Sequence, residues 1–348
     1  MDKSIDKKIR KNLLLSAIII SIFVSLAASQ DVEKVGTSAA TFLRVPVGAR
    51  AVAMGGAFVA QSNDVSALFW NPGGLARIDR YELLVDHSPW LPGLSFNYIA
   101  LAIPLQGYGT MGLSVTSLGT QKMDVTTPDQ PMGTGETFDA ASVAVGLSFS
   151  RKLTDRFSLG ATFKYVNERI FNSTATGFAL DIGAVYDTPF EGIRFGFSVS
   201  NFGTKMQMTG DDLNLRVDIA PDQKGNNQSV VGQLKTDRFD MPLIMRVGLA
   251  WDALNSDFNR LTIAVDGLNP NDNGHSLNVG AEYALFNEQV LLRAGYNELF
   301  LDEPEKGLTL GAGASLNVGG NIRLRAEYAY QQFIHLGDVN RYTLIVNF

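Results

Sequence analysis

Three histidines, His87, His275 and His335, are the first residues to consider for catalysis or metal binding, because the 348-residue sequence contains no cysteine. All three fall at or near loops expected on the outer side, and none has a second ligand at a spacing typical of metal sites. His275 and Ser276 cannot form a Ser–His pair, since adjacent residues of a strand point to opposite faces. We therefore predict no catalytic residue and no metal site, and we expect that the protein is not an enzyme.

The sequence also lacks patterns that are typical of phosphate binding or nucleic-acid binding. The triplets Gly311-Ala312-Gly313 and Gly133-Thr134-Gly135 do not lie between a strand and a helix, as a dinucleotide-binding motif requires, so we expect no cofactor. The net charge is −6, and no basic cluster occurs after the N-terminal segment. This charge distribution argues against a nucleic-acid partner.

The N-terminal segment has the pattern of a signal peptide. Four basic residues between positions 7 and 11 precede an apolar run from Leu13 to Leu26, and small residues follow at Ala27 and Ser29. This run is shorter than the roughly 20 apolar residues that a membrane-spanning helix needs. We predict a signal peptide over residues 1–29, cleaved near Ser29, and export of the chain.

From Tyr81 onward the sequence alternates between apolar and small or polar residues, the pattern of half-buried strands. Arg323, Arg325 and Glu327 share one face of such a strand, and an arginine facing lipid near the midplane would cost about 2–4 kcal/mol, so this face should line a lumen. We predict an all-β fold, a transmembrane antiparallel β-barrel over residues 81–348. Its fourteen strands are expected at 81–87, 94–103, 108–118, 139–151, 156–168, 177–187, 193–201, 242–252, 260–268, 276–284, 289–297, 308–317, 322–331 and 341–348.

The links between these strands mostly alternate between short and long, as the turns and loops at the two ends of an outer-membrane barrel do. The longest links are 119–138 and 202–241. For most residues of these links a solvated loop is the simplest interpretation, and a lid or docking surface is the alternative. Trp90 and Phe300, in other outer links, are expected to be interfacial anchors.

Residues 30–80 lack the strand period, and we predict that they form a plug, or hatch, inside the barrel. Gly55-Gly56 permits close backbone approach, Asn63 to Ser66 resembles the cap of a short helix, and the segment from Trp70 to Gly74 ends it. The plug carries three arginines that should pair with charges of the lumen wall. We expect Asp181 and Glu327 to be the partners of Arg44, Arg50 and Arg77.

The last strand presents a single apolar face made by Tyr342, Leu344, Val346 and Phe348. A terminal aromatic residue on such a strand resembles the sorting signal of bacterial outer-membrane barrels. Phe348 is therefore expected to be this signal, read by the barrel assembly machinery through the C-terminal strand. The expected location is the outer membrane, with its lipids as partners.

The plug segment also carries a resemblance to a family. Gly48-Ala49-Arg50-Ala51, Met54-Gly55-Gly56-Ala57, Asn63-Asp64 and the run from Ala67 to Ala76 resemble the N-terminal signature of the PorV/PorQ family, within the wider group of barrels similar to the fatty-acid transporter FadL. FadL-like members usually read Asn-Pro-Ala-Gly where this chain has Asn71-Pro72-Gly73-Gly74. The resemblance implies a fourteen-stranded outer-membrane barrel with an internal hatch.

The resemblance implies two different functions. A PorV-like barrel acts in type IX secretion and binds exported proteins with C-terminal signal domains, here through its outer loops. A FadL-like channel would take up long-chain fatty acids or other hydrophobic small molecules, and a purely structural or adhesive barrel is a third hypothesis. For the channel, the expected hatch and ligand path is Gly55, Gly56, Phe58, Phe69, Trp70, Asn71 and Pro72.

Overall fold

The computed structural model describes residues 36–222, 229–256 and 258–348. The predicted signal peptide therefore lies outside the described residues. Among the residues described, no helix is long and apolar enough to cross a membrane.

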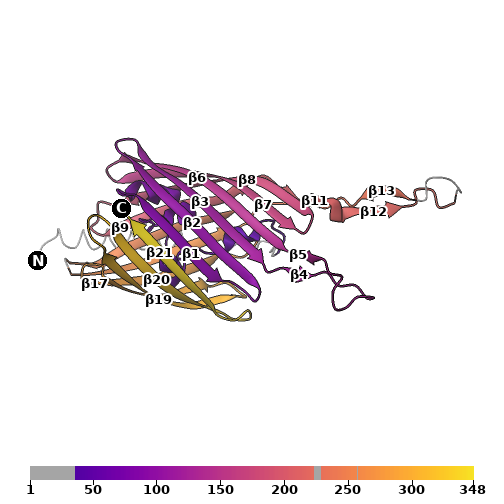
Figure 1. The fold of residues 1–348 in the computed structure, drawn as a ribbon. Coiled ribbons are helices and arrows are strands. Elements are labelled where there is room, and N and C mark those ends of the chain that lie inside the picture. The colour runs from indigo at the N-terminus through magenta and orange to yellow at the C-terminus, as the bar shows by residue number, and fades with distance from the viewer. Residues whose placement is uncertain (1–35, 223–228, 257) are drawn as a thin grey trace, which may run out of the picture.

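Fourteen long antiparallel strands form a closed wall (Figure 1). The closure is direct, because β1 pairs with β21 from Glu82↔Asn347 to His87↔Tyr342, and β9 pairs with both β8 and β15. The all-β barrel prediction is confirmed, and each strand overlaps its predicted range. The wall strands are β1 (Glu82–Pro89), β2 (Leu94–Leu105), β3 (Gly109–Thr120), β6 (Ala140–Thr154), β7 (Phe157–Ile170), β8 (Ser173–Asp187), β9 (Ile193–Gly203), β15 (Ile244–Asn255), β16 (Asn259–Pro270), β17 (Ser276–Leu285), β18 (Val290–Leu299), β19 (Lys306–Asn317), β20 (Arg323–Phe333) and β21 (Val339–Asn347).

The two faces of the wall differ as the sequence period predicts. In β7, Leu159, Phe163 and Tyr165 are exposed on the outside, whereas Thr162 and Lys164 are buried inside. This arrangement gives the hydrocarbon of a membrane an apolar surface and keeps polar groups in the lumen, where they can find partners.

The two ends of the wall also differ. One end has the compact turns and the C-terminus, and the other, which we call the outer end, has the two longest links (Figure 1). The first of these links contains the short strands β4 (Met123–Asp124) and β5 (Thr137–Phe138), which pair with each other. The sequence analysis predicted only loops here, because a hairpin with both faces in solvent has no buried face to impose a period.

The second long link, residues 204–243, extends farthest from the wall, and we call it the arm (Figure 1). It leaves the wall through β10 (Met206–Gln207), β11 (Thr209–Gly210) and η3 (Asp211–Leu213) and returns through β14 (Arg238–Phe239). Its distal hairpin is formed by β12 (Asn214–Val217) and β13 (Val230–Gln233), which pair from Asn214↔Gln233 to Val217↔Val230.

Residues 36–80, which we call the plug, lie inside the wall. They form η1 (Thr41–Arg44), α2 (Ala49–Ala53), α3 (Ala67–Trp70) and η2 (Pro72–Arg77). α2 contacts β18 to β21, whereas η2 contacts β3, β6, β7 and β8, so the segment reaches wall strands on different sides of the lumen. Its apolar residues join inward-facing Phe96 and Tyr98 in one buried cluster.

Candidate functional site

The plug enters the lumen through a backbone turn that the wall stabilises. Gly48 precedes α2 with φ of 76°, a value that glycine adopts without strain. Its N–H donates to Asp86 Oδ2 at 3.3 Å, and the N–H of Ala49 donates to Thr343 Oγ1 at 2.7 Å. Wall side chains therefore satisfy N–H groups at the start of α2, which have no partner within so short a helix.

Arg50, in α2, is the centre of a buried ion cluster. Its Nε and Nη2 donate to the two carboxylate oxygens of Glu282 on β17, at 2.8 and 2.9 Å, and its Nη1 donates to Asp64 Oδ2 at 2.8 Å. The side chains of Arg50, Asp64 and Glu282 are at most 5% exposed. Paired guanidinium–carboxylate contacts of this kind fix orientation as well as charge.

The cluster continues around the wall. Four arginines and four carboxylates are connected by eight ion pairs of 2.7–3.2 Å, and two of the eight groups, Arg50 and Asp64, belong to the plug. The plug therefore contributes one cation and one anion to a network in which charges of the plug and of the wall neutralise each other. The wall members are Arg260, Glu282, Glu288, Arg293, Arg325 and Glu327.

The predicted partners of the plug arginines were wrong. Arg44 pairs with Asp272 at 3.0 Å and Arg77 pairs with Asp187, while Arg50 pairs with Asp64 and Glu282. The sequence alternation had placed Glu282 on the inner face of its strand, but the assignment of partners needed the order of strands around the closed wall.

Asp181 and Glu327, the expected partners, bind cations of the wall itself. Asp181 pairs with Lys164 at 2.5 Å, and Glu327 pairs with Arg293 at 3.0 Å and Arg325 at 3.1 Å. All three cations project from the inner face of the wall. Lys164 lies on the strand next to Asp181, Arg325 on the same strand as Glu327, and Arg293 two strands away from it.

Gly55 and Gly56, predicted to lie on the hatch and ligand path, lie in a turn close to the wall, and Gly56 also lines a cavity near the outer end. A Cβ atom on Gly55 would lie 2.6 Å from the carbonyl oxygen of Val279 on β17, so only glycine fits there. The N–H of Gly55 donates to Thr309 Oγ1 at 3.0 Å, and its carbonyl accepts from Asn297 Nδ2 at 2.5 Å. This turn is therefore held by three neighbouring strands, β17, β18 and β19.

Asn71 and Pro72 make a second close contact, with β8. Asn71 Nδ2 donates to the carbonyls of Val59 and Ala184 at 2.8 and 3.0 Å, and Asn71 Oδ1 accepts from the N–H of Gly73 at 3.0 Å. A Cβ atom on Gly73 would lie 2.7 Å from the carbonyl oxygen of Gly183. The motif thus joins two parts of the plug to the wall, and the glycine that departs from the FadL-like pattern lies in this contact.

Phe58, Phe69 and Trp70 form the aromatic centre of the plug. The Trp70 ring centroid lies 6.2 Å from that of Phe58 and 5.2 Å from that of Phe69, both edge to face. Trp70 Nε1 donates to the carbonyl of Val47 at 3.0 Å, which satisfies its single donor. All three side chains are buried, and Trp70 also lines the cavity near the outer end, so their place on a ligand path stays a prediction.

Asp266, on β16, is a plug contact that the sequence analysis did not identify. Its Oδ2 accepts from the N–H groups of Phe58 and Val59 at 2.7 and 2.8 Å. The signal was present, because an acidic residue on a wall strand must face the lumen. The pattern of side chains in the sequence does not predict which backbone N–H groups this carboxylate binds.

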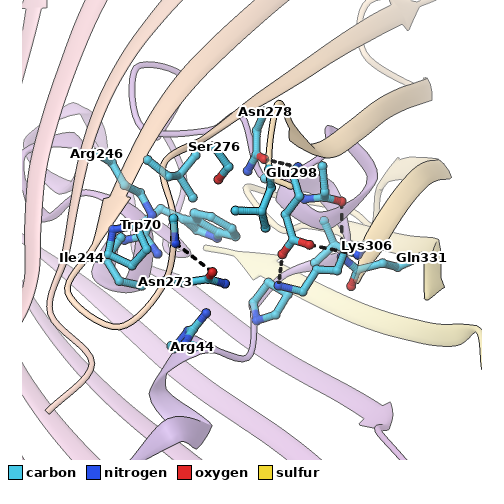
Figure 2. Close-up of a pocket in the computed structure, with 18 residues that line it drawn as sticks. Arg44, Trp70, Ile244, Arg246, Asn273, Ser276, Asn278, Glu298, Lys306 and Gln331 are labelled. Carbon is cyan, nitrogen blue, oxygen red and sulfur yellow. Dashed lines mark hydrogen bonds and ion pairs between the residues drawn. The ribbon is translucent and has the colours of Figure 1, made fainter. Parts of the chain in front are cut away.

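A cavity of about 70 Å³ lies between the plug and the outer end of the wall (Figure 2). Trp70 and Arg44 of the plug line it, together with Arg246 of β15 and residues of the outer links. The lining is mixed in character. Polar members from the wall and links are Asn273, Ser276, Asn278, Asn297, Glu298, Lys306 and Gln331.

Of the three histidines, His87 and His335 lie in separate contacts, and His275 Nδ1 is buried without a hydrogen-bond partner among the described residues. His87 Nδ1 is 2.8 Å from Asn97 Oδ1, and His335 Nδ1 is 2.8 Å from Glu305 Oε1 on the outside of the protein. Within the described part of the chain, no group of three or more acidic or histidine side chains could hold a metal ion. At the opposite end of the barrel, Phe348 stacks on Tyr81 with a centroid distance of 5.6 Å, and its sorting role stays a prediction.

Solved structures with the same fold include a FadL homologue and a toluene transporter. The chain is 15% identical to a Pseudomonas aeruginosa FadL homologue, with a TM-score of 0.50, over 87% of this chain and 98% of that one. It is 13% identical to the Pseudomonas putida toluene transporter TodX, with a TM-score of 0.52, over 91% and 98% of the two chains. At these identities the likeness shows the fold alone, a FadL-like outer-membrane barrel.

Sequence comparison is more specific. No curated protein sequence matches the chain. The family model described as "Type IX secretion system protein PorV" matches residues 27–221, which is more than half of the chain. The fourteen-stranded barrel and its buried N-terminal signature are in accord with that match. The protein therefore belongs to the PorV family of type IX secretion proteins.

Proposed function

We propose that this barrel binds exported proteins at its outer end during type IX secretion, and that its plug stays fixed while it does so. The observation that carries the proposal is the combination of a filled lumen with a long arm at the outer end (Figure 1). A barrel with this form presents a surface to partners and offers little internal space for a solute.

The lumen supports this role because little of it is free. Sites for drug-sized ligands commonly have about 300–1,000 Å³, whereas the cavity above the plug has about 70 Å³. The plug is joined to the wall by the ion cluster and by glycine contacts on two sides. A channel for a fatty acid would require several of these contacts to break together.

The arm supports the role because it exposes apolar side chains far from the membrane-facing wall. Ile219 is 65% exposed, Val231 64% and Leu234 58%. Exposed apolar residues grouped on a projection away from lipid are typical of a protein-binding surface. The distal hairpin also has two unpaired strand edges, to which an extended segment of a partner could add.

The test is a shortened arm. Residues 216–231 are replaced by Asn-Gly, a sequence suited to a two-residue hairpin turn, so that Leu215 and Gly232, which face each other in the ladder, are joined directly. The control replaces residues 334–338, another outer link, by a glycine–serine segment of equal length. Tagged proteins are purified from outer membranes, and the proteins and lipids that purify with them are identified by mass spectrometry.

The expected result is recovery of exported proteins with the unaltered chain and with the control, and loss of these proteins when the arm is shortened. Equal recovery with the shortened arm would refute the role of the arm. Recovery of hydrophobic small molecules without protein partners would refute the secretion role and favour the channel, which is the alternative function.

A further inference from the structure

The cavity between the plug and the outer end contains a buried cation whose charge no described residue neutralises by contact. Arg246 projects from β15 into the cavity lining and is 5% exposed. Its Nη1 donates to Ser200 Oγ at 3.2 Å, and its Nε has no hydrogen-bond partner. No ion pair joins Arg246 to any of the described residues, although a buried arginine normally has a carboxylate partner.

The other charged groups of the cavity are already neutralised. Arg44 pairs with Asp272 at 3.0 Å, and Lys306 pairs with Glu298 at 2.9 Å. Arg246 instead lies with its guanidinium carbon 5.6 Å from the centre of the Trp70 ring, and the carboxylates that act on it, Asp266 and Asp181, do so without an ion-pair contact. Among the described residues, the cavity therefore lacks a carboxylate in contact with this cation.

A buried acceptor without a donor lies on another side of the same cavity. Gln331, on β20, is 2% exposed, and its Oε1 accepts no hydrogen bond, while its Nε2 donates to Asn297 Oδ1 at 3.3 Å. Figure 2 shows Arg246 and Gln331 on opposite sides of the cavity. A ligand that satisfies both must offer an anion at one point and an N–H group at another.

We infer that the cavity binds the C-terminal carboxylate of an extended peptide, with Arg246 on the carboxylate and Gln331 Oε1 on a backbone N–H. This inference rests on the proposed function, since the peptide would be the end of a bound exported protein. A fatty acid offers the same carboxylate but no N–H group. Polar residues such as Asn273 and Glu298 line the cavity beside apolar ones such as Ile244, and a peptide backbone could pair with the polar ones whereas methylene groups could not.

The cavity size and position agree with a terminal group. A volume of about 70 Å³ accommodates a carboxylate and a small part of one residue, and the remainder of the ligand must leave towards the outer links. Asn273 and Gly274 of one outer link and Leu301 of another line the cavity on that side. The bound end would thus continue into the surface where the arm lies.

The experiment uses the full-length protein in detergent and three soluble probes. These are acetyl-Ala-Ser-Ala-Val with a free carboxylate, the same peptide as its C-terminal amide, and butyrate, and binding is measured by saturation-transfer NMR titration. The free-acid peptide should bind at least about tenfold more tightly than the amide, the size expected for a hydrogen-bonded charge. Butyrate, which lacks the N–H group, should bind more weakly than the free-acid peptide.

Two substitutions test separately the contact of Arg246 with the carboxylate and the contact of Gln331 with the N–H group. Arg246→Gln should remove the preference for the free acid, and Gln331→Leu should weaken the peptide several-fold without changing butyrate. Arg156→Gln, at the opposite end of the barrel, is the matched control and should change neither. If Arg246→Gln does not assemble, Arg246→Lys can be used in its place, since it keeps the charge. The comparison of the acid with the amide on the unaltered protein tests the inference without any substitution.

Equal binding of acid and amide, or an unchanged preference in Arg246→Gln, would overturn the inference. Butyrate binding as tight as the peptide would overturn the assignment to a peptide, because a carboxylate alone would then suffice. These outcomes are separate from the proposed function. Recovery of exported proteins through the arm can persist when the terminal carboxylate site fails, whereas loss of that recovery alone would refute the proposed function.

Discussion

Arg50→Met should loosen the plug, because it removes a cation that serves two buried carboxylates. Arg50 makes two hydrogen bonds to Glu282 and one to Asp64, and the cluster of four arginines and four carboxylates would be left with an excess negative charge. Removal of one partner from a buried pair costs about 3–5 kcal/mol. The free energy of plug opening should fall by this amount.

The contacts that remain reduce the cost of losing Arg50, which makes the lower end of this range the more relevant one. Glu282 keeps Arg293 at 2.7 Å and Arg260 at 3.0 Å, and Asp64 keeps Arg325 at 3.2 Å, so neither carboxylate becomes isolated. A change of 3–5 kcal/mol corresponds to an increase in the open population of between roughly one hundredfold and several thousandfold.

Thiol labelling measures this population directly, since the chain has no cysteine of its own. Ser62→Cys places one thiol at a fully buried plug position, where labelling requires opening. The labelling rate of Ser62→Cys with Arg50→Met is compared with that of Ser62→Cys alone. When opening and closing are fast relative to labelling, the ratio of rates gives the ratio of open populations.

Arg44→Met is the matched control, because Arg44 is also a plug arginine paired with a wall carboxylate. Its side chain is 30% exposed, against 5% for Arg50, and water therefore screens its charge. A partly exposed pair contributes about 0.2–1 kcal/mol, so the control should raise the rate less than about tenfold. Equal rates in the Arg50 and Arg44 variants would refute the view that the buried cluster fixes the plug.

Two further predictions concern other plug contacts. Gly183→Ala would place a Cβ atom 2.8 Å from Pro72 Cδ and should destabilise the protein to heat by about 1–3 kcal/mol, whereas Gly119→Ala, whose Cβ would be 3.8 Å from its nearest neighbour, should have little effect. Burial alone would raise the pKa of Asp64, but attraction by Arg50 and Arg325 and hydrogen bonds from Ser66 and Arg50 together outweigh it, and the pKa falls from 3.8 to about 2. Asp64 should therefore stabilise the plug above about pH 4 and lose this contribution as the pH falls towards 2, and thermal unfolding of Asp64→Asn between these pH values should lack that part of the dependence.

The wall could be predicted from sequence because one physical rule governs it. Each strand must place apolar side chains towards lipid and polar ones inside, so a period of two marks both the strands and the face of residues such as Glu327. The arm was predicted only as a loop, since its paired strands have no buried face. The glycine and asparagine motifs of the plug were recognised, but their contacts with wall strands far away in sequence were not.

The ion pairs of the plug show the limit of sequence reasoning most clearly. The expected partners, Asp181 and Glu327, are inward-facing carboxylates as predicted, yet both bind wall cations. Alternation gives the face of a side chain but not its height along the barrel axis or its position around the ring. Those coordinates depend on the stagger of all fourteen strands and on closure between β1 and β21.

The way in which the plug is held bears on what the barrel can do. Charge pairs could separate and re-form with solvent, but the glycine contacts at Gly55 and Gly73 leave no room for the plug to slide, because backbone touches backbone there. Movement of the plug would require both contacts and the ion cluster to separate together, and these lie on different sides of the lumen. The base of the arm is also fixed, because Met206 and Met241 are buried in one cluster with Phe42 and Leu43 of the plug, beside pairings such as Thr209↔Thr174. The distal hairpin has no such constraint, since among the described residues β12 and β13 pair only with each other. Binding energy from a partner would therefore reorganise the distal hairpin at lower cost than the plug, in accord with the proposed binding of partners at the outer end.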